Sequence, residues 1–180
     1  MSDKSSATFS SETNSIGIFV KGNLIDKYLA GIGHEMGHLH PFYGGFENKN
    51  TKTKWEIEET CEFIEDKIRL NFGDEEIEKL FFQEAKDSLD TLQKMGDHFS
   101  WEEAGVWTSD SPYEIIRFIY PWLEKQYGIE KLRELWNKLF KEKNDLSDSI
   151  KETYGKDLEI LENKFMEDFK IAKSYKDLWK

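Results

Sequence analysis

The sequence predicts an α+β fold that is predominantly helical, with one compact domain over residues 15–180 and a flexible segment over residues 1–14. Three observations lead to this prediction. The chain has 180 residues, of which 14% are aromatic and six are tryptophan, and this is enough for one sizeable core. Apolar residues recur at the spacing of a helix over most of the chain after Asn23. One short run of β-prone residues, Ile16 to Val20, comes before them.

The first quarter of the chain contains the expected β element and the first helix. Met1 to Asn14 is rich in serine and threonine, and we expect it to be loose or part of a hairpin. A helix is predicted to begin at Asn23, which is a good N-cap residue. Its apolar face consists of Leu24, Ile25, Tyr28, Leu29, Ile32, Met36 and Leu39. This periodicity makes Met36 a core residue. Glycines and asparagines between Pro41 and Thr53 indicate a loop.

The rest of the chain is expected to be helical. Helices are predicted over residues 54–71, 74–95, 129–142 and 146–172, and residues 96–110 are expected to be irregular. A further helix opens at Ser111-Pro112, with proline at its first position. Pro121 is expected to kink or split that helix, because proline has no N–H to donate.

His34-Glu35-Met36-Gly37-His38 is an HExxH motif within the first predicted helix. Two histidines four residues apart lie on one face of a helix, so both imidazoles can bind one ion. Glu35 follows the first ligand and can reach a water bound to that ion. Zinc lowers the pKa of such a water to about 7, and a nearby carboxylate can take its proton as general base. The motif therefore predicts a Zn²⁺ site with His34 and His38 as ligands and Glu35 as a catalytic residue.

A catalytic zinc site needs a third protein ligand and an open fourth position. Glu58 follows His38 after 19 intervening residues, within a second helical pattern that is rich in carboxylates. The end of one helix, a loop and a second, antiparallel helix fit in that gap. This arrangement would bring Glu58 back to the two histidines.

The residues around Glu58 carry a resemblance to a known family. Residues 55–63 read W-E-I-E-E-T-C-E-F, which resembles the W-x-x-E-G-x-A-x-Y string of the gluzincin metallopeptidases. The resemblance implies that Glu58 is the third zinc ligand, with Trp55 and Phe63 as packing residues and Cys61 in the small-residue place. Glu59 departs from the glycine of the family string.

Other interpretations of these residues exist. Four glutamates of the same helix could serve only to solvate one of its faces, namely Glu56, Glu59, Glu62 and Glu65. Alternatively, Glu62 could hold the imidazole of a zinc ligand. The metzincin pattern HExxHxxGxxH fails, because Pro41 and Gly44 stand where it needs glycine and histidine. His40 is interpreted as a helix-end residue rather than a ligand.

The C-terminal half carries a second resemblance. Residues 113–139 and 149–169 are similar to the helical lower half of M1-like or peptidase MA-like gluzincins, with a Y-G-x-x-K-L turn at Tyr127 and a G-x-x-L-x-x-L-E segment at Gly155. The small size resembles that of the minigluzincins. Together the resemblance covers about residues 16–170. It implies a gluzincin-like metallopeptidase domain with a short N-terminal β element, an HExxH active-site helix and a helical C-terminal half.

Tyr113 is a candidate for stabilising the transition state. Peptide hydrolysis builds a negative oxygen beside the zinc, and a phenol donor there stabilises it. Tyr113-Glu114 matches the first two places of the Y-E-K-G string of M1-like enzymes, whereas isoleucines replace the lysine and the glycine. The resemblance therefore implies Tyr113 as this donor, with an ordinary helix-start aromatic as the alternative. His98 is the other candidate donor.

Charge and cysteine content narrow the class of protein. A net charge of −11 argues against nucleic acid and against an anionic membrane as partners. A single cysteine excludes an internal disulfide and fits a reducing compartment. Met1 to Asn14 has no apolar stretch typical of a signal peptide, and no apolar run approaches 18 residues. We expect a cytoplasmic protein that acts on peptide or protein substrates.

The sequence as a whole predicts a zinc-dependent peptidase. The alternative is a zinc-stabilised protein-interaction module on a gluzincin scaffold with little or no turnover. Glu35 favours the enzyme, because a purely structural zinc site has no use for a base.

Overall fold

The structure is a computed structural model. It describes residues 6–10, 15–19, 31–34, 36, 55–73, 75–95, 100–101, 113–142 and 144–179. The helices are α2 (Trp55–Asn71), α3 (Glu76–Met95), α4 (Tyr113–Ile116), α5 (Ile119–Tyr127), α6 (Ile129–Asn137), α7 (Leu146–Tyr154) and α8 (Leu158–Ile171). A π-helical turn, Lys138–Glu142, extends α6, and a 3₁₀ turn, Tyr175–Asp177, follows α8. Residues 31–34 and 36 are also helical.

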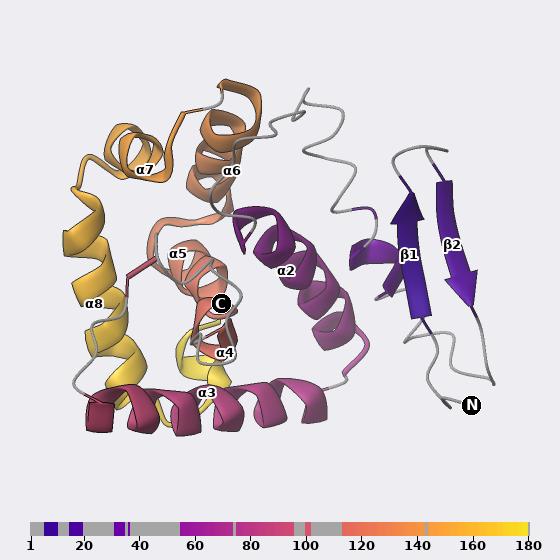
Figure 1. Cartoon of the computed structure of the whole chain (residues 1–180), viewed down its shortest axis with the longest axis horizontal. Helices are drawn as coiled ribbons and strands as arrows, with labels where there is room; N and C mark the ends of the chain where they lie inside the picture. The colour runs from indigo at the N-terminus through magenta and orange to yellow at the C-terminus, as the bar shows by residue number, and fades with distance from the viewer. Residues whose placement is uncertain are drawn as a thin grey trace.

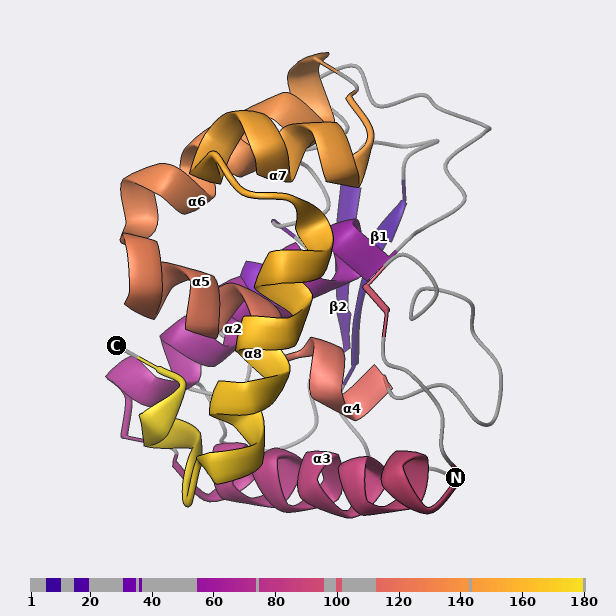
Figure 2. The ribbon, with the colours of Figure 1, turned by 90° about the vertical axis from the view of Figure 1, so that its left-hand side faces the viewer.

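The helices surround α5. α3 lies along one edge of the molecule, α8 stands beside it, and α6 and α7 lie at the opposite edge, while α4 and α5 occupy the middle (Figures 1 and 2). α2 packs against α5 on the side that faces the N-terminal segments. Among the described residues, no helix is long and apolar enough to cross a membrane.

The predicted α+β fold class is wrong. Within the described part of the chain, strands β1 (Ser6–Ser10) and β2 (Ser15–Phe19) pair only with each other, as an antiparallel ladder in which Ala7 faces Ile18. This two-stranded ribbon lies at the side of the molecule beyond α2 (Figure 1). Every buried apolar residue of the described chain lies between Cys61 and Trp179, and all of that core is built by helices and the turns that join them. The packed body is therefore all-helical.

The helix boundaries follow from a few residues. The predicted helix over residues 54–71 is confirmed by α2, and the one over residues 74–95 by α3. Pro121 splits its helix as expected: α4 ends at Ile116, α5 begins at Ile119, and Pro121 is then in the first turn, where its missing N–H is not needed.

The single helix predicted over residues 146–172 is wrong, because it is two helices. Gly155 has a φ of 66° and ends α7 in the left-handed conformation, with its N–H donating to the carbonyl of Lys151. α8 then begins after Asp157, whose extended backbone is that of an N-cap residue. Glycine adopts the left-handed conformation without steric strain, which is why the break falls at Gly155.

Aromatic rings fill the core between α5, α8 and α3. Trp122 meets Phe165 edge to face at 5.6 Å, and Phe118 meets both Phe82 and Phe169 at 5.7 and 5.9 Å between ring centroids. A second aromatic group fixes α2: Phe63 stacks on Trp179 at 5.5 Å and meets Trp136 edge to face at 5.7 Å. The C-terminal end of the chain thus packs directly onto the helix that carries Glu58. Phe63 and Cys61 are both buried, as expected of packing residues at those positions.

Met36 does not belong to this core. Its side chain is 56% exposed, so the prediction that it is a core residue is wrong. Met36 is two residues from His34, or about 200° around a helix. It therefore points away from α2 when His34 points toward it.

Candidate metal centre

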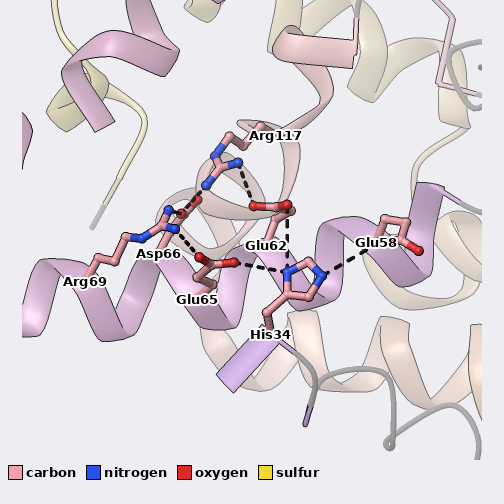
Figure 3. Close-up of polar contacts among 7 residues, drawn as sticks. All are labelled: His34, Glu58, Glu62, Glu65, Asp66, Arg69 and Arg117. Carbon is pink, nitrogen blue, oxygen red and sulfur yellow. Dashed lines mark hydrogen bonds and ion pairs between the residues drawn. The ribbon is translucent and has the colours of Figure 1, made fainter. Parts of the chain in front are cut away.

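The helical segment that contains His34 lies directly on α2. Gly33 is buried, and a Cβ atom at that position would lie 3.4 Å from Cγ2 of Ile64 and well inside van der Waals contact with Cδ1 of Ile68. The absence of a side chain therefore lets the two backbones approach closely. His34, the next residue, is carried onto the carboxylate-rich face of α2 (Figure 3).

Three carboxylates of α2 surround the imidazole of His34. Nε2 lies 3.9 Å from Oε2 of Glu58, whereas Nδ1 lies 3.1 Å from Oε2 of Glu65 and 3.8 Å from Oε1 of Glu62 (Figure 3). Glu58, Glu62 and Glu65 follow one another at intervals of four and three residues, so they share one face of the helix. The two ring nitrogens of His34 thus face different carboxylates.

Glu65 orients the ring of His34. Its Oε2 lies 3.1 Å from Nδ1, within reach of a proton on that nitrogen. Burial raises the pKa of Glu65, but the contact with His34 and the charge of Arg69 outweigh burial, and the net pKa is lowered. Glu65 is therefore a carboxylate at neutral pH. A carboxylate at Nδ1 favours the tautomer with its proton there, which leaves the lone pair on Nε2, on the side of Glu58.

Arg117 binds the remaining carboxylates of this face. It follows α4, and its buried guanidinium places Nη1 2.6 Å from Oε2 of Glu62 and Nη2 against Oδ1 of Asp66 (Figure 3). The same group lies over the ring of Phe81 at 3.8 Å. Burial alone would lower the pKa of Arg117, but Asp66 and Glu62 raise it more. The arginine is a permanent cation within the acidic cluster.

The interpretation of the α2 glutamates as a solvated face is wrong. Glu56 and Glu59 are 7% and 2% exposed, and the side chains of Glu62 and Glu65 are 19% and 12% exposed. Burial raises the pKa of Glu59 well above its usual value, and it also raises that of Glu62, although Arg117 lowers both in part. Helices that solvate a face do not bury four carboxyl groups, so these residues have a structural or chemical role.

A second carboxyl pair lies behind Arg117. Asp66 and Glu78 are fully buried, and the negative charge of Glu78 adds to burial in raising the pKa of Asp66, although Arg117 lowers it in part. Burial raises the pKa of Asp66 to about 8 and also raises that of Glu78. The pair titrates as a unit and is protonated once over much of the neutral range.

The side chains around His34 could hold a metal ion. Two ligand atoms of a tetrahedral zinc are about 3.3 Å apart, given ligand bonds of about 2.0 to 2.1 Å. The 3.9 Å between Nε2 of His34 and Oε2 of Glu58 needs only a small closure to meet that value. His34, Glu62 and Glu65 also form a compact group with ligand atoms within 4.8 Å of one another. We favour the Glu58 side, because Arg117 and Arg69 already neutralise Glu62 and Glu65, and an ion at Nδ1 would have to displace them.

The structure places the predicted site residues as follows. It brings His34 and Glu58 side by side, although the chain between them covers more than 20 residues. Tyr113 begins α4, but its side chain is not described. Glu35, His38 and His98 lie outside the described residues, and so does the side chain of Trp55.

Two residues of the site were not foreseen. Glu65 lies seven residues after Glu58, which is two helical turns, so the spacing alone could have identified it as a partner of the same imidazole. Glu62 was the predicted candidate for that contact, and it lies farther from Nδ1 than Glu65 does. Arg117 has no local signal, because its partners are about 50 residues away in the sequence.

A cavity of about 290 Å³ lies on another side of α2. Its walls are Thr60, Ile64, Arg133, Trp136 and Asn137. Thr60 is two residues after Glu58, or about 200° around the helix, so this cavity faces α6 rather than His34. It is therefore separate from the candidate metal centre.

Comparison with protein-family models, with curated proteins and with solved structures found no match to this chain.

Proposed function

We propose that this protein is a zinc-dependent peptidase in which His34, His38 and Glu58 hold the metal. The observation that carries the proposal is the meeting of His34 and Glu58, with Nε2 and Oε2 3.9 Å apart. The two histidines of an HExxH motif and a glutamate of a separate helix are the donor set of a catalytic zinc site of the gluzincin type, which leaves one position open.

The roles of the protein groups follow from their chemistry. Zinc, when bound, lowers the pKa of a water molecule and polarises the carbonyl of the peptide bond. Glu35 takes the proton of the attacking water as general base and delivers it to the leaving amine as general acid. Glu65 holds the imidazole of His34 in the tautomer that binds a metal through Nε2, and its negative charge raises the basicity of that nitrogen.

Tyr113 is proposed as the donor to the developing oxyanion. Support for this role comes from the way in which α4 is held. Near its start, Glu114 accepts a hydrogen bond of 3.0 Å from Ser88 of α3, and after its end, Arg117 binds Glu62 of α2. A helix fixed at both ends suits a residue that must hold its place relative to the metal ligands.

The proposed substrates are peptides or proteins, and the proposed compartment is the cytoplasm. Cys61 is buried and is the single cysteine of the sequence, and a sequence that offers no pair of cysteines for an internal disulfide suits a reducing environment. The overall net charge of −11 argues against nucleic acid as the substrate.

The proposal is tested by incubating the zinc-loaded protein with a peptide library and comparing it with the Glu35→Gln variant. The wild type should cleave peptides, and the variant should bind the same amount of zinc without cleaving, because glutamine keeps the shape and loses the base. Equal cleavage by both proteins would reject the mechanism. Stoichiometric zinc without cleavage by the wild type would reject the peptidase and support a zinc-stabilised interaction module instead.

A further inference from the structure

We infer that Arg117 is a positioning residue that decides which carboxylate of α2 orients His34. This inference rests on the proposed function only for its consequence on zinc binding. Two carboxylates compete for Nδ1 of His34, because Glu62 and Glu65 lie on the same face of α2, within 3.8 and 3.1 Å of that nitrogen. Arg117 binds Glu62, whereas Arg69 binds only Oε1 of Glu65, and Oε2 of Glu65 remains next to the imidazole.

The contacts of Arg117 explain how the choice is made. Its Nη1 lies 2.6 Å from Glu62, while its other terminal nitrogen binds Asp66, so the planar guanidinium spans two consecutive turns of α2 (Figure 3). A lysine could not contact both carboxylates in this way. The group is 8% exposed and lies over the ring of Phe81, which leaves it little freedom to turn away. Glu62 is therefore drawn toward the α4–α5 junction and away from His34.

The electrostatic consequence concerns the imidazole. Without Arg117, Glu62 would have no arginine partner and would repel the nearby Glu65. The ring of His34 would then have two alternative carboxylate partners at Nδ1. With Arg117 in place, Glu62 is neutralised, and Glu65 is the carboxylate nearest Nδ1. The ring then has one orientation, with Nε2 toward Glu58. In this way a residue of the C-terminal half fixes a metal ligand of the N-terminal half.

The test compares Glu65→Gln and Glu62→Gln in two backgrounds. One is the wild type, and the other is Arg117→Gln/Asp66→Asn, which removes the buried arginine together with the second carboxyl group that it binds. The first readout is the tautomer of His34 in the zinc-free protein, from the ¹⁵N chemical shifts of the ring, assigned with a His34→Gln spectrum. The second readout is zinc affinity by competition with a chelator.

In the wild-type background, Glu65→Gln should shift His34 away from the Nδ1–H tautomer and weaken zinc binding by about tenfold or more, the usual scale for an outer carboxylate. Glu62→Gln should leave the tautomer of His34 unchanged and should change the zinc affinity by less than about threefold. In the background that lacks Arg117, Glu62 is released and can replace Glu65, so the two glutamine variants should have similar, small effects.

An unchanged dependence on Glu65 in both backgrounds would overturn the role of Arg117. If the double background does not fold by circular dichroism, Arg117→Lys serves instead, because it keeps the charge and loses one of the two contacts; there too, the effect of Glu65→Gln should shrink. The tautomer is measured without metal. A protein that binds no zinc, but in which the dependence of the tautomer on Glu65 is lost together with Arg117, would reject the proposed function and still support the role of Arg117.

Discussion

Oε2 of Glu65 lies 3.1 Å from Nδ1 of His34, closer to that imidazole than the oxygens of Glu62 and Glu58 at 3.8 and 3.9 Å. The contact lies on the opposite side of the ring from Glu58, whose Oε2 is 3.9 Å from Nε2. An imidazole held at one nitrogen by a carboxylate, with its other nitrogen toward a second carboxylate, is the arrangement expected of a metal ligand.

Gly33→Ala should weaken zinc binding by about tenfold, because the new methyl group would collide with Cδ1 of Ile68 and push His34 away from Glu58. Chelator competition measures the change. Ile68→Val removes the atom that collides, so Gly33→Ala/Ile68→Val should recover most of the affinity, whereas Ile68→Val alone should leave it nearly unchanged. Failure of the second substitution to restore affinity would show that the close approach of Gly33 to α2 does not position His34.

Glu78→Gln should make the stability of the protein less sensitive to pH. The folded-state pKa of Asp66 is raised to about 8 by burial, and that of Glu78 is raised as well. Unfolded carboxyls have pKa values of about 4, so the folded chain holds the extra proton between those values. The contribution of this pair to stability is therefore complete below about pH 4 and is lost as the pH rises through about 8.

The measurement is denaturant unfolding of the wild type and of Glu78→Gln between pH 5 and pH 9. The free energy of unfolding of the wild type should fall more steeply with pH, by up to about 1.4 kcal/mol per pH unit for the one proton concerned. Glu76→Gln, on the exposed side of the same helix, is the control and should follow the wild type. Parallel curves for the wild type and Glu78→Gln would contradict the raised pKa values of this pair.

Tyr113→Phe should lower kcat by roughly 10²-fold with little change in stability, since only the hydroxyl that would donate to the oxyanion is lost. Tyr120→Phe is the matched control. The hydroxyl of Tyr120 is buried and donates to the backbone carbonyl of Glu56 at 3.3 Å, so its loss should cost about 1 kcal/mol of stability and leave kcat nearly unchanged. Steady-state kinetics and thermal unfolding on both variants separate the two roles. Normal turnover in Tyr113→Phe would contradict this role, and His98 would then be the candidate donor to test.

Trp179→Ala should reduce the free energy of unfolding by about 3–5 kcal/mol, the usual range for loss of a buried tryptophan. Trp179 is 5% exposed, and its ring stacks on Phe63 of α2 at 5.5 Å. Ile171→Ala, whose side chain is 75% exposed, should change stability by less than about 0.5 kcal/mol. Urea unfolding measures both. Similar losses for the two variants would mean that the C-terminal end of the chain does not hold α2.

Helices with a strong apolar period could be predicted closely from the sequence, and breaks within them less well. The period and the flanking signals were sufficient for α2 and α3. The break at Gly155 was missed because the apolar stripe keeps its register across it, from Ile150 to Leu158 and Leu161. The signal was nevertheless present, since Gly155 and Asp157 are together a C-terminal stop and an N-cap.

Errors in the site have one common cause. The local sequence does not show which helices meet α2. That information decides the burial of Glu56 and Glu59, the exposure of Met36 and the role of Arg117. A run of glutamates at helical spacing is the same pattern whether water or another helix covers it. The proximity of His34 and Glu58 could be predicted from the sequence, because a short motif and a fixed spacing define it.

The most direct test of the account is the zinc content of the wild type, of Glu58→Gln and of Glu62→Gln, measured by elemental analysis after dialysis against a weak chelator. The two variants lose the same charge one helical turn apart on the same face of α2. The account predicts about one zinc per chain in the wild type and in Glu62→Gln, and strongly reduced zinc in Glu58→Gln. Zinc retained in Glu58→Gln and lost in Glu62→Gln, or absent from the wild type itself, would contradict it.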